Sequence, residues 1–271
     1  MLRDRLLTAA LLIPLVVFGV LELPTLWIGL ILALLTLLGA WEWAALSGYA
    51  ERRQRLAYSA AYLPLLGLLW WLPSSFALWL LGGVAVAWLG ASLWLLRLRQ
   101  PLPLDVGGSP LKLALGLVVL LPTWWALLLL HGREPDGPLL LLALLVLIWG
   151  ADSGAYFAGR RWGRLRLAPL VSPGKTLEGA LGALAVGLLA GGLLAWWQPW
   201  IGLGWALLLT LVVVVISISG DLLESWMKRR AGVKDSGQLL PGHGGILDRI
   251  DSLTAAAPSA LFLLLLLERS A

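Results

Sequence analysis

Several carboxylates interrupt segments of this chain that are otherwise strongly apolar. Asp152 lies within one apolar run, and Asp221 and Glu224 end another, three residues apart and therefore on one face of a helix. Asp248 and Asp251 repeat this spacing where the last apolar run begins. Placing a carboxylate in a bilayer costs at least ~2.5–3.5 kcal/mol on insertion scales, so we expect Asp152, Asp221 and Glu224 to have a function.

The available donor atoms indicate a hard divalent cation. The chain has no cysteine and two histidines, which removes thiolate zinc sites and a thiol nucleophile. Magnesium takes one or two carboxylates together with waters and substrate phosphates, so carboxylates at two predicted helix ends suit it. As an alternative, Asp248 and Asp251 would cap a helix and Glu224 would be a surface charge. That alternative does not explain Asp221, which directly follows residues 216–220.

A basic, glycine-containing segment separates the two acidic pairs. Residues 241–245 read Pro-Gly-His-Gly-Gly, and glycine lets backbone N–H groups approach phosphate oxygens just before the positive end of a helix. A second basic loop, around Lys175, precedes another predicted helix. Taken singly, the basic run would more often mark a cytoplasmic loop, and His243 would more often be a hydrogen-bonded loop residue. The basic side chains of the first segment are Lys228, Arg229, Arg230 and Lys234.

Together these features predict metal-assisted phosphoryl or nucleotidyl transfer at one face of a membrane. The P-loop pattern G-x-x-x-x-G-K-[ST] does not occur, and neither does the esterase pattern G-x-S-x-G nor the zinc-protease pattern H-E-x-x-H. Charge neutralisation and in-line positioning dominate such transfers, and covalent catalysis is not required.

The elements that position these residues are predicted to be membrane helices. Apolar residues make up 60% of the chain of 271 residues and charged residues 13%, whereas a soluble domain has about 25% charged residues. At ~20 residues per crossing, the apolar runs are long enough, or nearly so, to span a bilayer. We therefore predict an all-α polytopic membrane protein with about nine transmembrane helices. The runs lie near 6–21, 25–46, 56–72, 74–96, 111–130, 138–158, 177–197, 202–223 and 251–267.

The basic residues predict the orientation of these helices. All lysines and arginines except Arg133 and Arg269 fall at the N-terminus or in the alternate loops that share its side. Because basic residues mark cytoplasmic loops, we expect the N-terminus in the cytoplasm and the C-terminus outside. The net charge of +5 then serves topology and affinity for anionic membrane lipids, which removes nucleic acid as a partner.

One integrated membrane domain is expected. Residues 1–136 would supply about five spans, and residues 137–271 about four, with cytoplasmic loops at 159–176 and 224–250. The second part contains the residues that point to catalysis.

Residues 225–251 resemble the signature of the phosphatidate cytidylyltransferases, also called CDP-diacylglycerol synthases. The family pattern has Ser, Lys-Arg and Lys-Asp, then His-Gly-Gly-x-x-Asp-Arg-x-Asp at fixed spacing, and this segment fills all of those positions. Segments 152–156 and 172–179 are also similar to the family. They depart from it at Gly174, where lysine is common, and at Leu177, where an aromatic residue is common.

The resemblance implies the reaction CTP + phosphatidate → CDP-diacylglycerol + pyrophosphate, an early step of phospholipid biosynthesis. It implies one or two Mg²⁺ ions, a site on the cytoplasmic face of a bacterial inner membrane, and a homodimer. Glu42, between two tryptophans, is similar to the family as well. The implied metal ligands are Asp221, Asp248 and Asp251, which with Lys228 and His243 are the implied catalytic residues. The implied substrate-binding residues are Asp152, Ser172, Lys175, Lys228, Arg229, Lys234, Gly244, Gly245 and Arg249.

Three other functions could use residues of these types. A transporter or channel would use Asp152 and Asp221 as an ion path, with carboxylates near the bilayer midplane and functional groups on both faces. A CDP-alcohol phosphotransferase would carry the motif D-G-x-x-A-R followed by G-x-x-x-D-x-x-x-D, which is absent. A kinase acting on a lipid alcohol would share the Mg²⁺ and phosphate sites but would recognise ATP.

Overall fold

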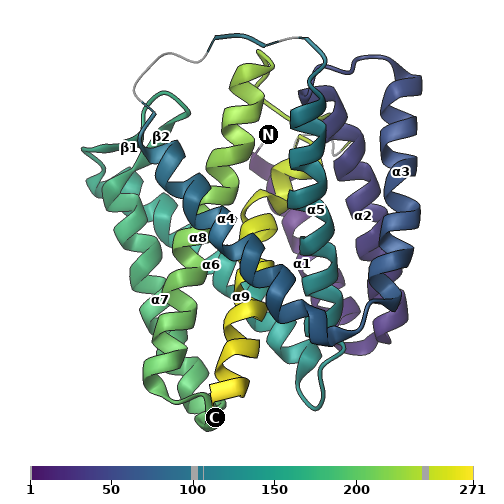
Figure 1. Cartoon of the computed structure of the whole chain (residues 1–271). Helices are drawn as coiled ribbons and strands as arrows, with labels where there is room; N and C mark the ends of the chain where they lie inside the picture. Colours follow the sequence, from purple (N-terminus) through teal and green to yellow (C-terminus); the bar gives the residue numbers. More distant parts are fainter. Residues whose placement is uncertain (1, 99–102, 106, 240–243, 271) are drawn as a thin grey trace.

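The computed structural model describes residues 2–98, 103–105, 107–239 and 244–270, with side chains described from residue 12 to residue 269 within those ranges. The described residues form a bundle of α-helices with one short hairpin at one end (Figure 1). The helices are α1 (Leu2–Glu22), α2 (Thr25–Leu46), α3 (Arg52–Trp71), α4 (Ala77–Leu96), α5 (Pro110–His131), α6 (Gly137–Trp162), α7 (Leu177–Trp197), α8 (Leu203–Arg230) and α9 (Leu247–Ser270). The strands are β1 (Arg166–Ala168) and β2 (Ser172–Thr176), and two 3-10 turns are η1 (Ser74–Phe76) and η2 (Pro199–Ile201).

The α-helices in the described residues coincide with the predicted apolar runs. Seven of them are long and apolar enough to cross a membrane, which confirms the all-α polytopic prediction. The two helices outside that group are α1 and α3. In α1 the stretch Leu12–Glu22 is an apolar helix in the shorter class of 10–17 residues, and α3 begins with Arg52 and Arg53. That these two also cross, and that the spans number nine, stays a prediction.

Two helices continue beyond the apolar runs that predicted them. Helix α6 continues through Trp162 and α8 through Arg230, so the loops predicted at 159–176 and 224–250 begin later than expected. The last turn of each helix contains basic side chains, which interact favourably with the negative end of the helix dipole. Polarity therefore marks the end of the apolar stretch but not the end of the helix.

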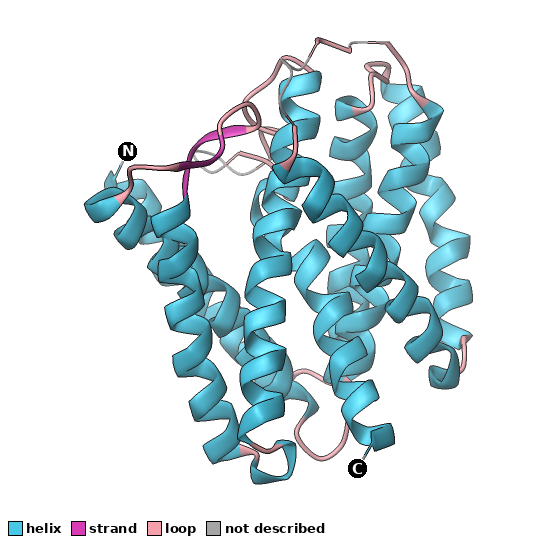
Figure 2. Cartoon of the chain, turned by 60° about the vertical axis from the view of Figure 1, so that its left-hand side comes forward, coloured by secondary structure: helices cyan, strands magenta, loops and turns pink. Residues whose placement is uncertain are grey.

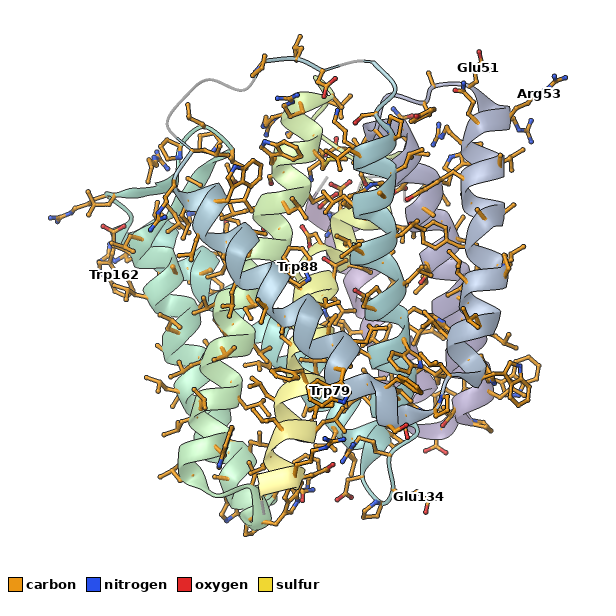
Figure 3. The ribbon with its side chains drawn as sticks, viewed as in Figure 1. Glu51, Arg53, Trp79, Trp88, Glu134 and Trp162 are labelled. Atoms are coloured by element: carbon orange, nitrogen blue, oxygen red, sulfur yellow. The ribbon has the colours of Figure 1, made fainter. Side chains whose placement is uncertain are left out.

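The connections between helices sort into the two ends of the bundle. The α2–α3 connection, the described parts of the α4–α5 connection and the hairpin lie at one end, and the α5–α6 and α7–α8 connections lie at the other (Figures 1 and 2). In Figure 3, Glu51 and Arg53 mark the first end and Glu134 the second. The basic connections thus share one end of the bundle, and that this end faces the cytoplasm stays a prediction.

The hairpin is an element that the apolar pattern did not predict. Strands β1 and β2 pair antiparallel, with Arg166 opposite Thr176. Thr176 also caps α7, because its Oγ1 accepts a hydrogen bond from the backbone N of Gly179 at 3.1 Å. Lys175 belongs to β2 and directly precedes Thr176, so the strand pairing and the helix cap together fix its backbone.

Helices α6 and α7 approach closely because small residues face each other. A Cβ atom at Gly182 would collide with Ala158 Cβ and with the backbone of Gly154. Small residues of this kind let membrane helices pack backbone against backbone. The α6–α7 pair packs against α8, and these three helices surround the cavity described below.

Helices from both halves of the chain share one core. Helix α5 packs against α9, and α4 packs against α8 and α9. Thr123 Oγ1 on α5 donates to Thr254 O on α9 at 2.9 Å, and Ser92 Oγ on α4 donates to Ser219 Oγ on α8 at 2.6 Å. The helices within residues 1–136 therefore support the helices that carry most of the site. The predicted division of the chain after residue 136 stays a prediction.

Candidate active site

A cavity of about 540 Å³ lies between α6, α7, α8 and the hairpin. Three of the residues expected from the sequence line it: Asp152, Lys175 and Asp221. Apolar side chains, among them Ala183 and Ile218, form much of the remaining wall. Such a lining suits a ligand that joins an anionic group to an apolar one. The other polar residues of the lining are Tyr156, Arg160, Arg166, Thr176 and Ser217.

Arg160 and Tyr156 form a unit on α6, beside the cavity. The Arg160 Nη1 atom donates to Tyr156 Oη at 2.8 Å, and the guanidinium carbon lies 6.0 Å from the centroid of the tyrosine ring. The spacing of four residues, which brings two side chains together on a helix, is the signal that could have found this pair. The sequence by itself predicts only a topological role for Arg160.

Lys175 and Asp221 form an ion pair in the wall of the cavity. Lys175 Nζ, from β2, lies 2.6 Å from Asp221 Oδ2, from α8, and both side chains are about one quarter exposed. Ser225 Oγ, one turn further along α8, donates to Asp221 Oδ1 at 3.2 Å. Hydrogen bonds between two ionised groups are short and strong, so this pair orients both side chains.

Lys228 and Asp248 form a second, less exposed ion pair. Lys228 Nζ lies 2.6 Å from Asp248 Oδ1 and 3.4 Å from Glu224 Oε2, and all three side chains are largely buried. Asp248 Oδ2 accepts hydrogen bonds from Ser236 N at 2.9 Å, from Ser236 Oγ at 3.0 Å and from Gly245 N at 2.8 Å. The Asp248 carboxylate therefore ties α8, the segment before α9 and the first turn of α9 together.

Glu224 and Asp251 are the remaining carboxylates of the site, and their charges interact between α8 and α9. Asp251 Oδ1 accepts a hydrogen bond from Ser252 N at 2.7 Å. Neither Glu224 oxygen has a hydrogen-bond partner within the described part of the chain, although the side chain is 4% exposed. Lys228 Nζ, 3.4 Å from Oε2, is an ion-pair partner of Glu224, so this carboxylate has a neighbouring cation but lacks the hydrogen bonds that a buried polar group normally has.

The carboxylates fit a hard cation as an open site. Among the described residues no three acidic or histidine side chains gather into a ready ligand set, and Asp221 and Asp248 each face a lysine. Mg²⁺ does not need a closed protein cage, because one or two carboxylates usually share it with waters and substrate phosphates. The all-oxygen donors agree with that mode of binding. Ligation by Asp221, Asp248 and Asp251 stays a prediction.

The other expected residues lie around this centre or outside the described chain. Ser172 begins β2. Gly245 uses its N–H group on Asp248, and Gly244 has a φ of 82°, in the left-handed region that favours glycine. His243 lies outside the described residues. Exposed basic side chains from the list of expected substrate-binding residues are Arg229, Lys234 and Arg249.

Glu42, on α2, contacts residues of the candidate site, which the sequence alone does not predict. Its side chain is fully buried. Its two oxygens accept hydrogen bonds from Ile246 N, Leu247 N and Ser236 Oγ. The signal that could have found it is the one applied to Asp152, namely a carboxylate within an apolar run.

Asp105 joins the connection after α4 to the end of α8. Asp105 Oδ2 lies 2.8 Å from Lys112 Nζ and 2.8 Å from Arg230 Nη2, and Asp105 N donates to Arg230 O at 2.8 Å. Hydrogen bonds from Lys112, which has the larger effect, and from Arg230 hold the pKa of the Asp105 carboxyl below its ordinary value. Arg230 is thus engaged in this contact, next to the expected phosphate-binding residues.

Known proteins similar to this chain carry the name phosphatidate cytidylyltransferase. Phosphatidate cytidylyltransferase from Pseudomonas aeruginosa is 45% identical over 267 residues, which cover 95% of each chain. The enzyme of the same name from Haemophilus influenzae is 37% identical over 281 residues, covering 95% of this chain and 96% of its own. The one from Synechocystis is 45% identical over 167 residues, covering 60% and 55%. The cytidylyltransferase family model matches residues 3–267, and this chain therefore belongs to the cytidylyltransferase family as an integral membrane nucleotidyltransferase.

Proposed function

We propose that this chain transfers the cytidylyl group of CTP to phosphatidate, giving CDP-diacylglycerol and pyrophosphate in a Mg²⁺-dependent reaction. The observation that carries the proposal is the Lys175–Asp221 ion pair in the wall of a cavity of about 540 Å³ whose remaining lining is in large part apolar. Relatives named phosphatidate cytidylyltransferase, aligned over 95% of this chain, support the same substrates. The product would enter phospholipid biosynthesis.

The reaction depends on charge neutralisation more than on proton transfer. A phosphate oxygen of phosphatidate attacks the α-phosphorus of CTP, the bond from that phosphorus to the bridging oxygen breaks, and pyrophosphate leaves. A phosphomonoester has a second pKa of about 6, as phosphorylated side chains do, so the nucleophile is largely ionised at pH 7. No strong general base is therefore required, and His243 is proposed to orient a substrate.

Lys175 is the cation that we assign to the first contact with a substrate phosphate. Its ammonium group lines the cavity, and its ion-pair partner among the described residues is Asp221. An incoming phosphate would replace the carboxylate as the partner of Lys175 and leave the Asp221 oxygens to the metal. Arg160 and Arg166 add positive charge to the same cavity, and lysine and arginine are the usual phosphate-binding side chains.

Asp221 and Asp248, supported by Asp251, are proposed to hold Mg²⁺. When bound there, the metal would neutralise charge on the transferred group and on the leaving pyrophosphate. Lys228 holds the Asp248 carboxylate in place, and we propose that its positive charge also attracts the CTP phosphates. Further residues proposed to surround the substrates are Asp152, Ser172, Arg229, Lys234, Gly244, Gly245 and Arg249.

The site must serve two substrates of opposite solubility. CTP arrives from water, whereas the acyl chains of phosphatidate stay in the leaflet. We place the site at the cytoplasmic face of a bacterial inner membrane, because the basic connections share the hairpin end of the bundle (Figure 1). A homodimer is part of the same proposal. The transporter alternative is set aside, because the chain belongs to an enzyme family.

The decisive experiment supplies purified protein in detergent with labelled CTP, phosphatidate and either Mg²⁺ or EDTA. We expect labelled liponucleotide and an equal amount of pyrophosphate with Mg²⁺ and neither product with EDTA. Asp221→Asn should lower the rate roughly 100-fold or more, as loss of one charge-stabilising group does in other enzymes. The matched control is Glu51→Gln, which removes an exposed carboxylate at the same end of the bundle. A wild-type protein that makes no liponucleotide, or that phosphorylates a lipid alcohol from ATP, would contradict the proposal.

A further inference from the structure

Glu42 is a fully buried acidic residue, far along the chain from the signature segment. Its side chain is 0% exposed, and it belongs to α2, one of the helices long and apolar enough to span the membrane. Burying a carboxylate is costly unless hydrogen bonds replace its lost hydration. The contacts that replace this hydration therefore indicate what Glu42 does.

All described hydrogen bonds of the Glu42 carboxylate go to the segment that precedes and begins α9. Oε1 accepts from Ile246 N at 3.0 Å, and Oε2 accepts from Leu247 N at 2.9 Å and from Ser236 Oγ at 3.0 Å. The first backbone N–H groups of a helix have no partner within the helix. Glu42 thus caps α9 from another helix, where its negative charge also meets the positive end of the helix dipole.

The same contacts connect Glu42 to Asp248. Ser236 Oγ lies 3.0 Å from Glu42 Oε2 and 3.0 Å from Asp248 Oδ2, so one hydroxyl bridges the two carboxylates. Gly245 N, adjacent to the Ile246 N that Glu42 binds, donates to Asp248. The position of the Asp248 carboxylate therefore depends on the residues that Glu42 holds.

Glycine packing shows how closely this segment lies on Glu42. A Cβ atom at Gly237 would overlap Glu42 Oε1, and one at Gly245 would overlap Glu42 Oε2 and Ser236 Oγ. Gly245 thus has a structural reason to be glycine that is independent of any phosphate. Gly237 and Gly245 therefore have no room for a side chain on the side of Glu42.

We propose that Glu42 is the positioning residue of the site: through Ser236 and the first N–H groups of α9, it sets Asp248 in the place where the metal and CTP phosphates require it. The Glu42 side chain is fully buried, so it acts through other residues and does not touch substrate. This inference rests on the proposed function, because Asp248 is taken to serve nucleotidyl transfer. The sequence alone offers no reason to join α2 to the signature segment.

The first test compares Glu42→Gln with the wild type and with Glu51→Gln, an exposed carboxylate with no role in the site. Glutamine keeps the size of the side chain but presents an NH₂ group to backbone N–H donors. We expect kcat to fall by roughly 10- to 100-fold, as it does when the partners of metal ligands are removed. The KM for phosphatidate should stay within about twofold and the Mg²⁺ concentration for half-maximal activity should rise, because Asp248 is misplaced while the cavity is intact. Unchanged kcat and Mg²⁺ requirement in folded Glu42→Gln protein would overturn the proposal and leave a purely stabilising cap.

The second test uses Ser236→Ala, which removes the bridging hydroxyl and keeps every charge. We expect the same rise in the Mg²⁺ requirement, and we expect the Glu42→Gln and Ser236→Ala effects on kcat to be less than additive in the double variant. Wild-type kcat and Mg²⁺ requirement in Ser236→Ala, or additive effects, would overturn the coupling. If Glu42→Gln does not fold, Ser236→Ala decides alone.

Binding of Mn²⁺, measured without substrate by electron paramagnetic resonance, separates this inference from the proposed function. Weaker Mn²⁺ binding by Glu42→Gln than by Glu51→Gln is expected even if the wild type makes no liponucleotide. Equal Mn²⁺ affinity in the two variants would overturn the positioning role, whereas an inactive wild type with normal Mn²⁺ binding would overturn only the proposed reaction.

Discussion

Lys175 on the hairpin and Asp221 on α8 meet at 2.6 Å in the wall of the cavity, with both side chains about one quarter exposed. The Lys228–Asp248 pair has the same N···O distance but lies largely buried, with three further hydrogen bonds to Asp248 Oδ2. Partly exposed pairs contribute about 0–1 kcal/mol, whereas breaking a buried pair is costly. The first pair can therefore open for substrate, and the second holds the site together.

Lys175→Ala should lower activity with little change in stability. Loss of the ammonium group removes a cation from the cavity, so we expect a higher KM for CTP or phosphatidate and a lower kcat. The free energy of unfolding should fall by no more than about 1 kcal/mol, because the lost pair is partly exposed. Initial rates and thermal unfolding of the same preparation measure both effects. Arg53→Ala, at the same end of the bundle, is the control, and equal kinetics in the two variants would contradict the role of Lys175 (Figure 3).

Asp221→Asn and Asp248→Asn should both lower activity, but they should differ in how much they lower the free energy of unfolding. Replacing Asp248 leaves Lys228 without its nearest partner in a buried place. We expect a loss of about 3 kcal/mol, the lower end of the range for a broken buried pair, because Glu224 stays 3.4 Å away. Asp221→Asn should cost about 1 kcal/mol or less. Unfolding measured for both proteins in one detergent tests the order, and an equal loss would show that burial does not distinguish the two pairs.

The stability of the protein should depend on pH through Asp105. Its folded pKa lies below the ordinary value of 3.8, because Lys112 and Arg230 donate hydrogen bonds to the ionised form. The stabilisation is therefore fully present above pH 3.8 and is lost as the pH falls through the lower, folded pKa. Asp105→Asn should be less stable than the wild type at pH 7, and the difference should shrink below about pH 4. Melting temperatures across this range decide, and a difference that does not change with pH would exclude titration of Asp105.

Two glycines of α7 should respond oppositely to alanine. At Gly182 a Cβ atom would collide with Ala158 and with the backbone of Gly154, so Gly182→Ala should cost about 1–3 kcal/mol through overpacking. At Gly192 a Cβ atom would meet open space, so Gly192→Ala should be neutral or stabilise by up to about 1 kcal/mol. Thermal unfolding of both variants measures this. Similar losses would mean that the close approach of α6 and α7 is not what Gly182 provides.

The two ends of the bundle should face opposite sides of the membrane. Reporter fusions after residues 105 and 135, which lie in the α4–α5 and α5–α6 connections, should report the cytoplasm and the outside, respectively. Alkaline phosphatase activity and green fluorescence distinguish the two compartments. The same compartment at both positions would refute the orientation derived from the basic residues.

The sequence by itself determined the helices of this protein and selected most of the residues of its candidate site. Hydropathy is a local property, because a helix that enters a bilayer must satisfy its backbone internally and present apolar side chains. The runs near 25–46 and 177–197 consequently coincide with α2 and α7. The cost of a carboxylate in an apolar run likewise selected Asp152, Asp221 and Glu224 without any knowledge of the fold.

Only the tertiary structure decided which of these residues meet. Many arrangements of the same helices would bury similar apolar area, so hydropathy does not specify that Lys175 pairs with Asp221 and Lys228 with Asp248. The pairing of β1 with β2 and the close glycine contact between α6 and α7 bring Lys175 to Asp221. The capping of α9 by Glu42, from a helix almost the whole chain away, sets the place of Asp248. Contacts between distant residues depend on how the backbones pack, and no local pattern encodes that.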